Sequence, residues 1–144
     1  MFISINGGRL PEAGTKYSAG LDVYANEEVE LWSGFTEFIP LGIKLDIDYI
    51  QKNDLQTNHY LALEIRSSMR ARELSSLGTG IIDMDYTGEI KLILHNHSKH
   101  GRVKINKGDK IGQLILMQHN PHHTWQYRQT DDVRNEQGFG STGK

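Results

Sequence analysis

The sequence predicts an all-β domain, either a sandwich or a barrel. Apolar and polar residues alternate over several short segments, most clearly at 43–47, 60–65 and 90–94. Such alternation is typical of strands with one buried face. Clusters of glycine, proline, asparagine and aspartate separate the segments at intervals of roughly 8–12 residues, as in sandwiches and barrels. We therefore expect roughly ten short strands.

The expected strands follow one another along nearly the whole chain. In order, they lie at 2–5, 21–25, 27–31, 60–65, 90–94, 103–105 and 111–117, with a strand pair within 35–47 and a last strand near Trp125 and Tyr127. Residues 10–18 and 48–59 are rich in turn formers and polar side chains, so we expect surface loops there. One short helix is expected at 67–74, where Ser67 or Ser68 can cap a run of helix-forming residues.

The 144 residues are enough for one domain with its own core. From residue 129 onward, Val133 and Phe139 are the only large apolar side chains. Such a segment buries too little surface to become ordered by itself. We therefore expect a β-core at 1–128, followed by a flexible C-terminal arm at 129–144.

Composition argues against several classes of protein. The formal net charge of -2 gives no overall basic field for nucleic acid or a membrane surface, and no stretch has the length of a membrane span. The absence of cysteine excludes a disulfide framework and thiolate metal sites. Residues 1–6 lack the features of a signal peptide. We expect a protein of the cytoplasm, or of the host cell interior if the source is a virus or phage, that is not secreted and contacts neither membrane nor nucleic acid directly.

Residues 78–89 carry the densest set of reactive and turn-forming groups. They hold three glycines together with Asp83, Asp85 and Tyr86, and they lead into the apolar alternation at 90–94. Glycine permits close backbone approach, and acids two apart on a strand share one face. These features predict a β-hairpin with a functional tip. The alternative is a polar turn, which is the commoner origin of such a composition.

Three further stretches offer groups for phosphate or metal. Asp22 lies among apolar residues of an expected strand, where it is suited either to a hydrated Mg²⁺ or to an outward-facing polar position. The Arg66-Ser67-Ser68 run opens the expected helix, so it predicts either a phosphate site or a simple helix cap. Gln113 is the polar residue within an apolar run, and a buried amide needs a partner in the core or on a ligand.

The tail and the histidines are weaker signals. Residues 134–144 combine glycines, hydroxyls and cations as an anion-binding nest does, although a disordered terminus gives the same composition. Six histidines fall into two groups: His95, His97 and His100, then His119, His122 and His123. A transition-metal site is disfavoured because no cysteine or acidic ligand set accompanies them at matching spacing.

Five stretches, in this order, resemble the five ordered motifs of the homotrimeric dUTPase family. They are 19–22, 66–68, 80–89, 108–115, and Arg134 with 138–143. The resemblance runs from about residue 19 to the C-terminus. It implies a jelly-roll-like β fold, a homotrimer with active sites at subunit contacts, and Mg²⁺-dependent hydrolysis of dUTP to dUMP and pyrophosphate by water attack on the α-phosphorus. It also implies a role in limiting uracil in DNA and in supplying dUMP for thymidylate synthesis.

The resemblance also implies residue roles. Asp83 would activate the attacking water and touch the sugar 3'-OH, and Asp22 would hold Mg²⁺ through water. The implied substrate contacts are the backbone of Gly80, Ile81 and Ile82 for uracil, Tyr86 for deoxyribose, Arg66, Ser67, Ser68 and Gln113 for phosphates, and, from the arm, Arg134, Ser141 and Thr142 for the γ-phosphate end with Phe139 and Gly140 over the base. The arm would close over the site and complete it.

Three departures from the family pattern stand out. Ile65 occupies the place of a usual proline, Asn135 and Gln137 replace usual glycines, and the stretch 48–58 is longer than the usual turn. Two alternatives remain beside an active dUTPase. A related deoxycytidine triphosphate deaminase, or a bifunctional form, on the same fold is disfavoured because the third motif is of the dUTPase type. A nucleotide-gated regulator is the other; the intact Asp83 argues against a dead enzyme but leaves a second role open.

Overall fold

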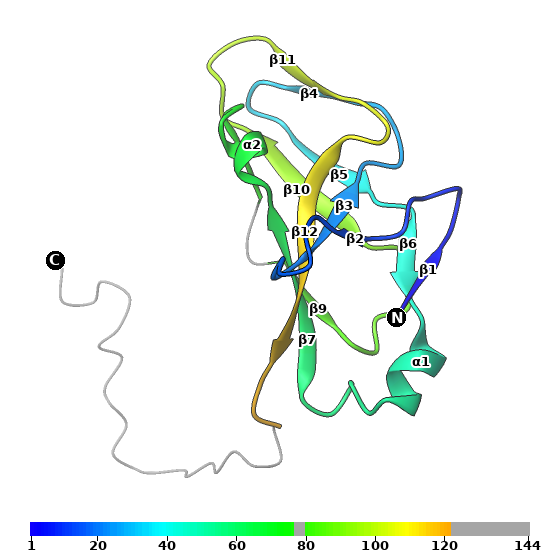
Figure 1. The fold of residues 1–144 in the computed structure, drawn as a ribbon. Helices are drawn as coiled ribbons and strands as arrows, with labels where there is room; N and C mark the ends of the chain where they lie inside the picture. Colours follow the sequence, from blue (N-terminus) through cyan, green and yellow to red (C-terminus); the bar gives the residue numbers. More distant parts are fainter. Residues whose placement is uncertain (77–79, 122–144) are drawn as a thin grey trace, which may run out of the picture.

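Antiparallel strands form almost all of the regular structure in the computed structural model, which describes residues 1–76 and 80–121 (Figure 1). The strands are β1 (Phe2–Ser4), β2 (Glu12–Ala13), β3 (Leu21–Tyr24), β4 (Val29–Trp32), β5 (Thr36–Pro40), β6 (Ile43–Leu45), β7 (His59–Ile65), β8 (Leu74–Ser76), β9 (Gly80–Asp83), β10 (Lys91–Asn96), β11 (Arg102–Ile105) and β12 (Lys110–Gln118). The helices are α1 (Ile47–Lys52) and α2 (Ser67–Arg70). The all-β prediction is therefore confirmed. Neither helix is long and apolar enough to cross a membrane.

The largest sheet has the strand order β2-β3-β12-β7-β9. The nine-residue β12 lies at its centre and pairs with β7 from Gly112 opposite Ile65 to Gln118 opposite His59. A second sheet has the order β5-β10-β8, and two-stranded ribbons join β11 to β4 and β1 to β6. In the described residues, β9 is thus an edge strand of the largest sheet, with one side of its backbone free of strand partners.

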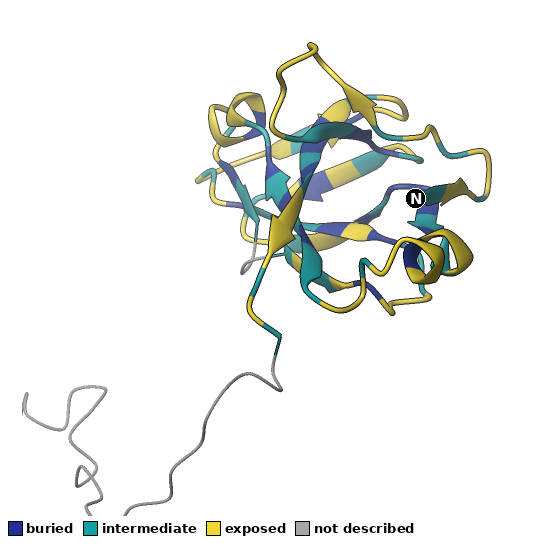
Figure 2. Ribbon diagram, turned by 60° about the horizontal axis from the view of Figure 1, so that its bottom comes forward, coloured by how far each residue is buried: buried dark blue, intermediate teal, exposed yellow. Residues whose placement is uncertain are grey.

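The core lies between these sheets and follows the alternation seen in the sequence. Leu61, Leu63 and Ile65 of β7 are buried, as are Leu92 and Leu94 of β10. Full burial of one such side chain contributes roughly 1.5–3 kcal/mol to folding. Figure 2 shows buried positions alternating with exposed ones along the strands. The residues between them therefore form the outer faces of the sheets.

The prediction of a surface loop at 48–59 was wrong in its first part, because α1 begins there. The Asp46 carboxylate accepts a hydrogen bond from the backbone N–H of Tyr49 at 3.2 Å and so caps the helix. Ile50 is fully buried on the core side. The prediction of a single helix is corrected to two short ones among the described residues, and β2 likewise forms a short strand within the expected loop at 10–18.

The helix expected at 67–74 is shorter than predicted. The capping residue of α2 is Arg66, which makes no side-chain cap, so the prediction that Ser67 or Ser68 caps the helix was wrong. Glu73 adopts a positive φ of 58°, and the chain then pairs Leu74 with Asn96 of β10. Burial of Leu74 in the core outweighs local helix propensity here.

Two expected strand pairings also differ. Within 35–47, β5 pairs with β10 and β6 pairs with β1, so these neighbours in sequence do not pair with each other. At 78–89, β9 pairs with β7, whereas β10 pairs with β5 and β8, so the segment is a turn between two sheets. Asp83 ends β9 and Asp85 lies in the turn, so the two acids do not share one strand. The strand expected near Trp125 and Tyr127 lies outside the described residues.

The close approach of the backbone at Gly42 to Gly8 suggests a stability test. Gly42 has a φ of +65°, and a Cβ added to it would lie 2.5 Å from Gly8 Cα. We expect Gly42→Ala to lower the free energy of unfolding by roughly 2–4 kcal/mol, since left-handed strain and overpacking add. Gly34→Ala is the matched control, because Gly34 has a φ of +77° with no heavy atom within 4 Å. Urea unfolding at equal protein concentration compares the two, and equal losses would contradict the steric explanation.

Candidate functional site

The outer face of the largest sheet carries most of the described residues of interest. Register aligns them in three cross-strand rows: Asp22–Gln113–Glu64, Ile115–Ala62–Ile81 and Met117–Tyr60–Asp83. The first row is polar, the second is apolar, and the third ends in the candidate catalytic carboxylate. Gln113 lies four residues from Met117 along β12, about 13 Å, and two strands from β9, about 10 Å. The Cα atoms of Gln113 and Asp83 are therefore roughly 16 Å apart within one chain.

Asp83 lies at the edge of an open pocket of about 370 Å³. The pocket is lined by Ile81, Ile82, Asp83, Asp85, Tyr86 and Thr87. The turn that shapes it is closed by the N–H of Tyr86, which donates to the carbonyl of Asp83 at 3.1 Å. Within the described part of the chain, no hydrogen bond or ion pair engages the Asp83 carboxylate, which is exposed. It is therefore available to a water molecule or a ligand hydroxyl.

Tyr86 is held in place by the two residues that follow its turn. Its hydroxyl donates to the carbonyl of Glu89 at 3.2 Å, and a Cβ on Gly88 would overlap that hydroxyl oxygen. The Glu89 carboxylate in turn accepts the N–H of Gly42 at 3.0 Å. Tyr86 is 45% exposed and lines both the first pocket and a second hollow of about 220 Å³. The glycine at position 88 is thus a steric requirement for the position of Tyr86.

Gly80 has a similar role at the start of β9. A Cβ there would lie 2.6 Å from the carbonyl oxygen of Leu63, so only glycine lets β9 approach β7 this closely. Ile81, the next residue, is 60% exposed. The backbone of Gly80, Ile81 and Ile82 consequently lines an open sheet edge beside the pocket.

The polar end of the same face is an ion cluster centred on Asp22. Arg66 Nη1 donates to Asp22 Oδ1 at 2.9 Å, and Lys110 Nζ donates to Asp22 Oδ2 at 3.0 Å. The Asp22 side chain is 16% exposed, whereas that of Lys110 is 46% exposed. The arrangement leaves one net positive charge in this cluster, and each cation has donors to spare for an anion.

Lys110 was not among the residues predicted from the sequence. It lies three positions from Gln113, an odd spacing that a regular strand would place on the opposite face. A bulge between Lys110 and Gly112 shifts the register and brings Lys110 to Asp22. No sequence pattern announces this bulge, and the basic residue at the start of the apolar strand was the only available signal.

The other predicted phosphate contacts surround this cluster. Ser67 and Ser68 are exposed and directly follow Arg66, so their hydroxyls are free to meet a ligand. The prediction that Gln113 is buried was wrong, because it is half-buried on the outer face. A Cβ on Gly20 would lie 3.3 Å from Gln113 Oε1, so this glycine leaves room for the amide. Residues Arg134, Phe139, Gly140, Ser141 and Thr142 lie outside the described residues.

No group of three or more potential metal ligands occurs in residues 1–76 and 80–121. His95 Nδ1 lies 2.9 Å from Thr36 Oγ1, and His97 Nε2 lies 2.5 Å from Ser75 Oγ, so each of these two ring nitrogens is hydrogen-bonded to a hydroxyl. Asp22 fits Mg²⁺ only through water, since both of its oxygens already bind cations. This fit is adequate for an ion that keeps several waters and is held mainly by substrate phosphates.

Comparison with known proteins identifies the family. The model of the dUTPase family matches residues 7–143. The chain belongs to the dUTPase family. Deoxyuridine 5'-triphosphate nucleotidohydrolases of Candida glabrata and Rickettsia akari are 32% and 34% identical to it, with 95% and 94% of this chain and 90% and 89% of those proteins covered.

Solved structures agree with this assignment. The dUTPase of Streptococcus mutans has a TM-score of 0.70 at 26% identity, covering 83% of this chain and 95% of that one. A mutant dUTPase from phage phi11 of S. aureus, whose structure reveals the coordination of a structural Mg(II) ion, has a TM-score of 0.71 at 20% identity, covering 92% and 97%. The second likeness shows a shared fold. This dUTPase therefore has the β fold that the motifs predicted.

Proposed function

We propose that this dUTPase hydrolyses dUTP to dUMP and pyrophosphate by attack of water on the α-phosphorus. The observation that carries the proposal is the free, exposed carboxylate of Asp83 beside a pocket walled by Tyr86. A carboxylate in reach of a water can act as general base and accelerate the reaction by roughly 10²–10⁴-fold. The same carboxylate would also accept a hydrogen bond from the sugar 3'-OH.

The open edge of β9 supports recognition of uracil. An edge strand presents a fixed pattern of N–H and C=O groups. The backbone of Gly80, Ile81 and Ile82 would pair with the base, and a 5-methyl group is rejected if this edge leaves no room for it. Tyr86 would lie against the deoxyribose and leave no space for a 2'-OH, which distinguishes dUTP from UTP.

The distance between the two ends of the sheet supports a shared active site. Arg66, Ser67, Ser68 and Gln113 would bind phosphates, yet Gln113 is roughly 16 Å from Asp83 in the same chain. The side chains of Gln113 and Asp83 project from the same sheet face and not toward each other, so a single chain does not bring them to adjacent phosphates. We therefore propose a homotrimer in which each site takes Asp83 from one subunit and the phosphate contacts from a neighbour. Cyclic symmetry makes three such sites equivalent.

Mg²⁺ and the C-terminal arm complete the proposed site. Magnesium supplies charge neutralisation on the triphosphate and would be held by Asp22 through water. The arm at 129–144, beyond the core at 1–128, would close over the nucleotide. In it, Arg134, Ser141 and Thr142 would bind the γ-phosphate end, with Phe139 and Gly140 over the base. Closure of this kind excludes water that is not the nucleophile.

The proposed activity places the protein in nucleotide metabolism. Removal of dUTP limits uracil in DNA, and the dUMP formed is a substrate for thymidylate synthesis. We propose that this takes place in the cytoplasm or, for a virus or phage, in the interior of the host cell.

A substrate panel tests the reaction. The full-length protein is incubated with Mg²⁺ and dUTP, dCTP, dTTP or UTP, and pyrophosphate and ammonia are measured. We expect pyrophosphate from dUTP alone. Ammonia from dCTP would assign a deaminase, and tight dUTP binding without turnover would assign a nucleotide-gated regulator.

Mixed trimers test the shared site directly. Asp83→Asn removes the proposed base and Arg66→Ala weakens the proposed phosphate binding, so each variant alone should turn over slowly at a dUTP concentration below the wild-type KM. Co-expression combines the two kinds of subunit at random. If Asp83 and Arg66 of a site come from different subunits, about a quarter of the sites in a 1:1 mixture are intact. We expect steady-state dUTP turnover to recover to about that fraction. A mixture as inactive as its parents would show that both residues act within one subunit.

A further inference from the structure

The segment before β3 packs on the ion cluster from the side opposite Arg66. Arg9 binds Glu12 with two hydrogen bonds, Nε to Oε1 at 3.2 Å and Nη2 to Oε2 at 2.7 Å. The guanidinium carbon of Arg9 lies 4.0 Å from the ring centroid of Tyr24, and the Tyr24 hydroxyl donates to Glu12 Oε2 at 3.4 Å. Tyr24 is buried. Arg9 and Glu12 therefore hold the Tyr24 ring in position.

The same ring lies beside Lys110. The ammonium of Lys110 is 5.9 Å from the Tyr24 centroid and 3.0 Å from Asp22 Oδ2. Register sets Tyr24 opposite Lys110 on β12. A lysine stem loses roughly 1.5–2 kcal/mol of rotamer freedom when it is fixed, so a preset position benefits any ligand that needs its charge.

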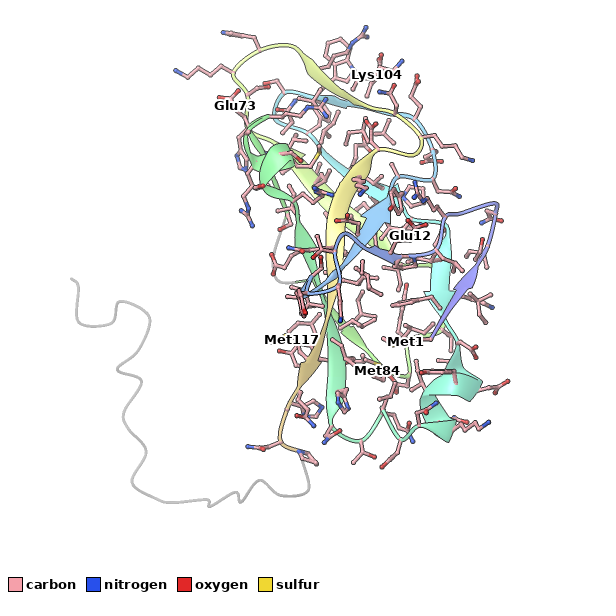
Figure 3. All side chains as sticks on the ribbon, in the orientation of Figure 1. Met1, Glu12, Glu73, Met84, Lys104 and Met117 are labelled. Atoms are coloured by element: carbon pink, nitrogen blue, oxygen red, sulfur yellow. The ribbon has the colours of Figure 1, made fainter. Side chains whose placement is uncertain are left out.

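Two carboxylates of the cluster face each other across strands. Glu12 of β2 is the register partner of Asp22 of β3, and like charges directly opposite are destabilising. Figure 3 labels Glu12 beside β3. The cations Arg9, Arg66 and Lys110 surround the pair and offset this repulsion. The hydrogen bond from Arg9 lowers the pKa of Glu12 from its ordinary value, so Glu12 stays ionised at neutral pH.

We propose that Arg9 and Glu12 are positioning residues for phosphate binding, acting through Tyr24 on Lys110. Arg9 holds Tyr24, the ring and Asp22 hold the ammonium of Lys110, and Lys110 binds the triphosphate together with Arg66. This inference rests on the proposed phosphate end of the site but does not require turnover. It adds Lys110 as a direct ligand of phosphate and gives the segment that precedes β3 a function in substrate affinity.

Titration with inorganic tripolyphosphate by calorimetry tests the inference on the full-length protein. We expect Arg9→Ala to weaken binding about three- to tenfold, as loss of one cation–π contact and its coupled ion pair would. Arg102→Ala is the matched control: Arg102 also binds a glutamate, Glu30 at 2.8 Å, and also stacks on an aromatic ring, Trp32 at 5.4 Å. The two arginine side chains are similarly exposed, 53% and 51%, but Arg102 lies on β11, which forms a separate two-stranded ribbon with β4. The control should bind as the wild type does.

A double-mutant cycle separates positioning from general stability. In a Lys110→Ala background, Arg9→Ala should change the dissociation constant by less than about twofold, because the path through Lys110 is already broken. Arg9→Lys, which keeps a cation over the ring, should restore most of the affinity. An Arg9→Ala effect that persists in full without Lys110, or one shared by Arg102→Ala, would overturn the proposal. So would wild-type protein that fails to bind tripolyphosphate.

Steady-state kinetics distinguish this inference from the reaction itself. Arg9→Ala should raise the KM for dUTP and leave kcat close to wild type, because Arg9 is proposed to act on phosphate binding through Tyr24 and Lys110 and not on the attacking water. An equal loss in kcat would contradict a role confined to phosphate affinity. Wild-type protein without dUTP turnover would overturn the proposed reaction, whereas the tripolyphosphate titration would still decide the role of Arg9.

Discussion

Asp83→Asn is expected to abolish turnover while preserving affinity for dUTP. The amide cannot accept a proton from water at neutral pH, so a loss on the order of 10²–10⁴ in kcat is expected. Shape and hydrogen-bonding capacity are largely retained, and no other described residue depends on the Asp83 carboxylate. Single-turnover rates with dUTP and Mg²⁺, together with calorimetric binding of a non-hydrolysable dUTP analogue, measure the two effects separately.

Asp85→Asn is the matched control for this substitution. Asp85 lines the same pocket, and its replacement by Asn removes the same charge, but Asp85 lies in the turn after β9. We expect its kcat to stay within a few-fold of wild type. If Asp85→Asn were the variant that lost turnover, the catalytic base would have to be reassigned to the turn.

Arg66→Ala is expected to have the second largest effect. It removes the proposed forked donor for phosphate and, among the described residues, leaves the mostly buried Asp22 with Lys110 as its one remaining cation. Truncating one partner of a desolvated charge pair at a binding interface costs on the order of 2–5 kcal/mol, so loss of the proposed Arg66–phosphate pair should weaken tripolyphosphate binding by at least about 30-fold. Calorimetry and the KM for dUTP report the loss.

Two companion variants define the cause of that effect. Arg66→Lys keeps the charge without the planar fork, so it should recover only part of the affinity. Arg70→Ala removes a neighbouring cation whose contact with Glu64 is 3.8 Å and exposed, so it should have little effect. Equal losses for Arg66→Ala and Arg70→Ala would indicate a diffuse basic surface instead of a specific phosphate ligand.

Alternation of apolar residues predicted the strands that build the core. The segments 60–65 and 90–94 lie largely within β7 and β10, and their alternate apolar residues are buried as expected. Long-range pairing was not predictable in the same way. The glycine-rich segment 78–89 has the composition of a hairpin, but its flanking strands join different sheets, because partners distant in sequence bury their apolar faces. Likewise, Ile50 draws a polar stretch into α1.

The candidate site divides along the same line. Motif order located Asp83, Tyr86, Asp22 and Arg66, all of which lie on or beside two ends of one sheet face. Lys110 was not predicted as a site residue because the bulge after it places its side chain on the same sheet face as Asp22. The ionic engagement of both Asp22 oxygens was also invisible, since it depends on three strands meeting. Residue types and order thus supplied the candidate residues, whose roles stay predictions, and register supplied their contacts within the sheet.

The roughly 16 Å gap between Asp83 and the phosphate contacts has a consequence for gene dosage. In a trimer with shared sites, a copy that carries both Asp83→Asn and Arg66→Ala damages two different sites. One such copy beside two normal ones leaves one working site, whereas self-contained subunits would leave two. A doubly defective allele should therefore be partly dominant, and an allele with either change alone should be recessive to a greater degree. The degree of dominance of the doubly defective allele would therefore show whether the two ends of the sheet face act in different sites.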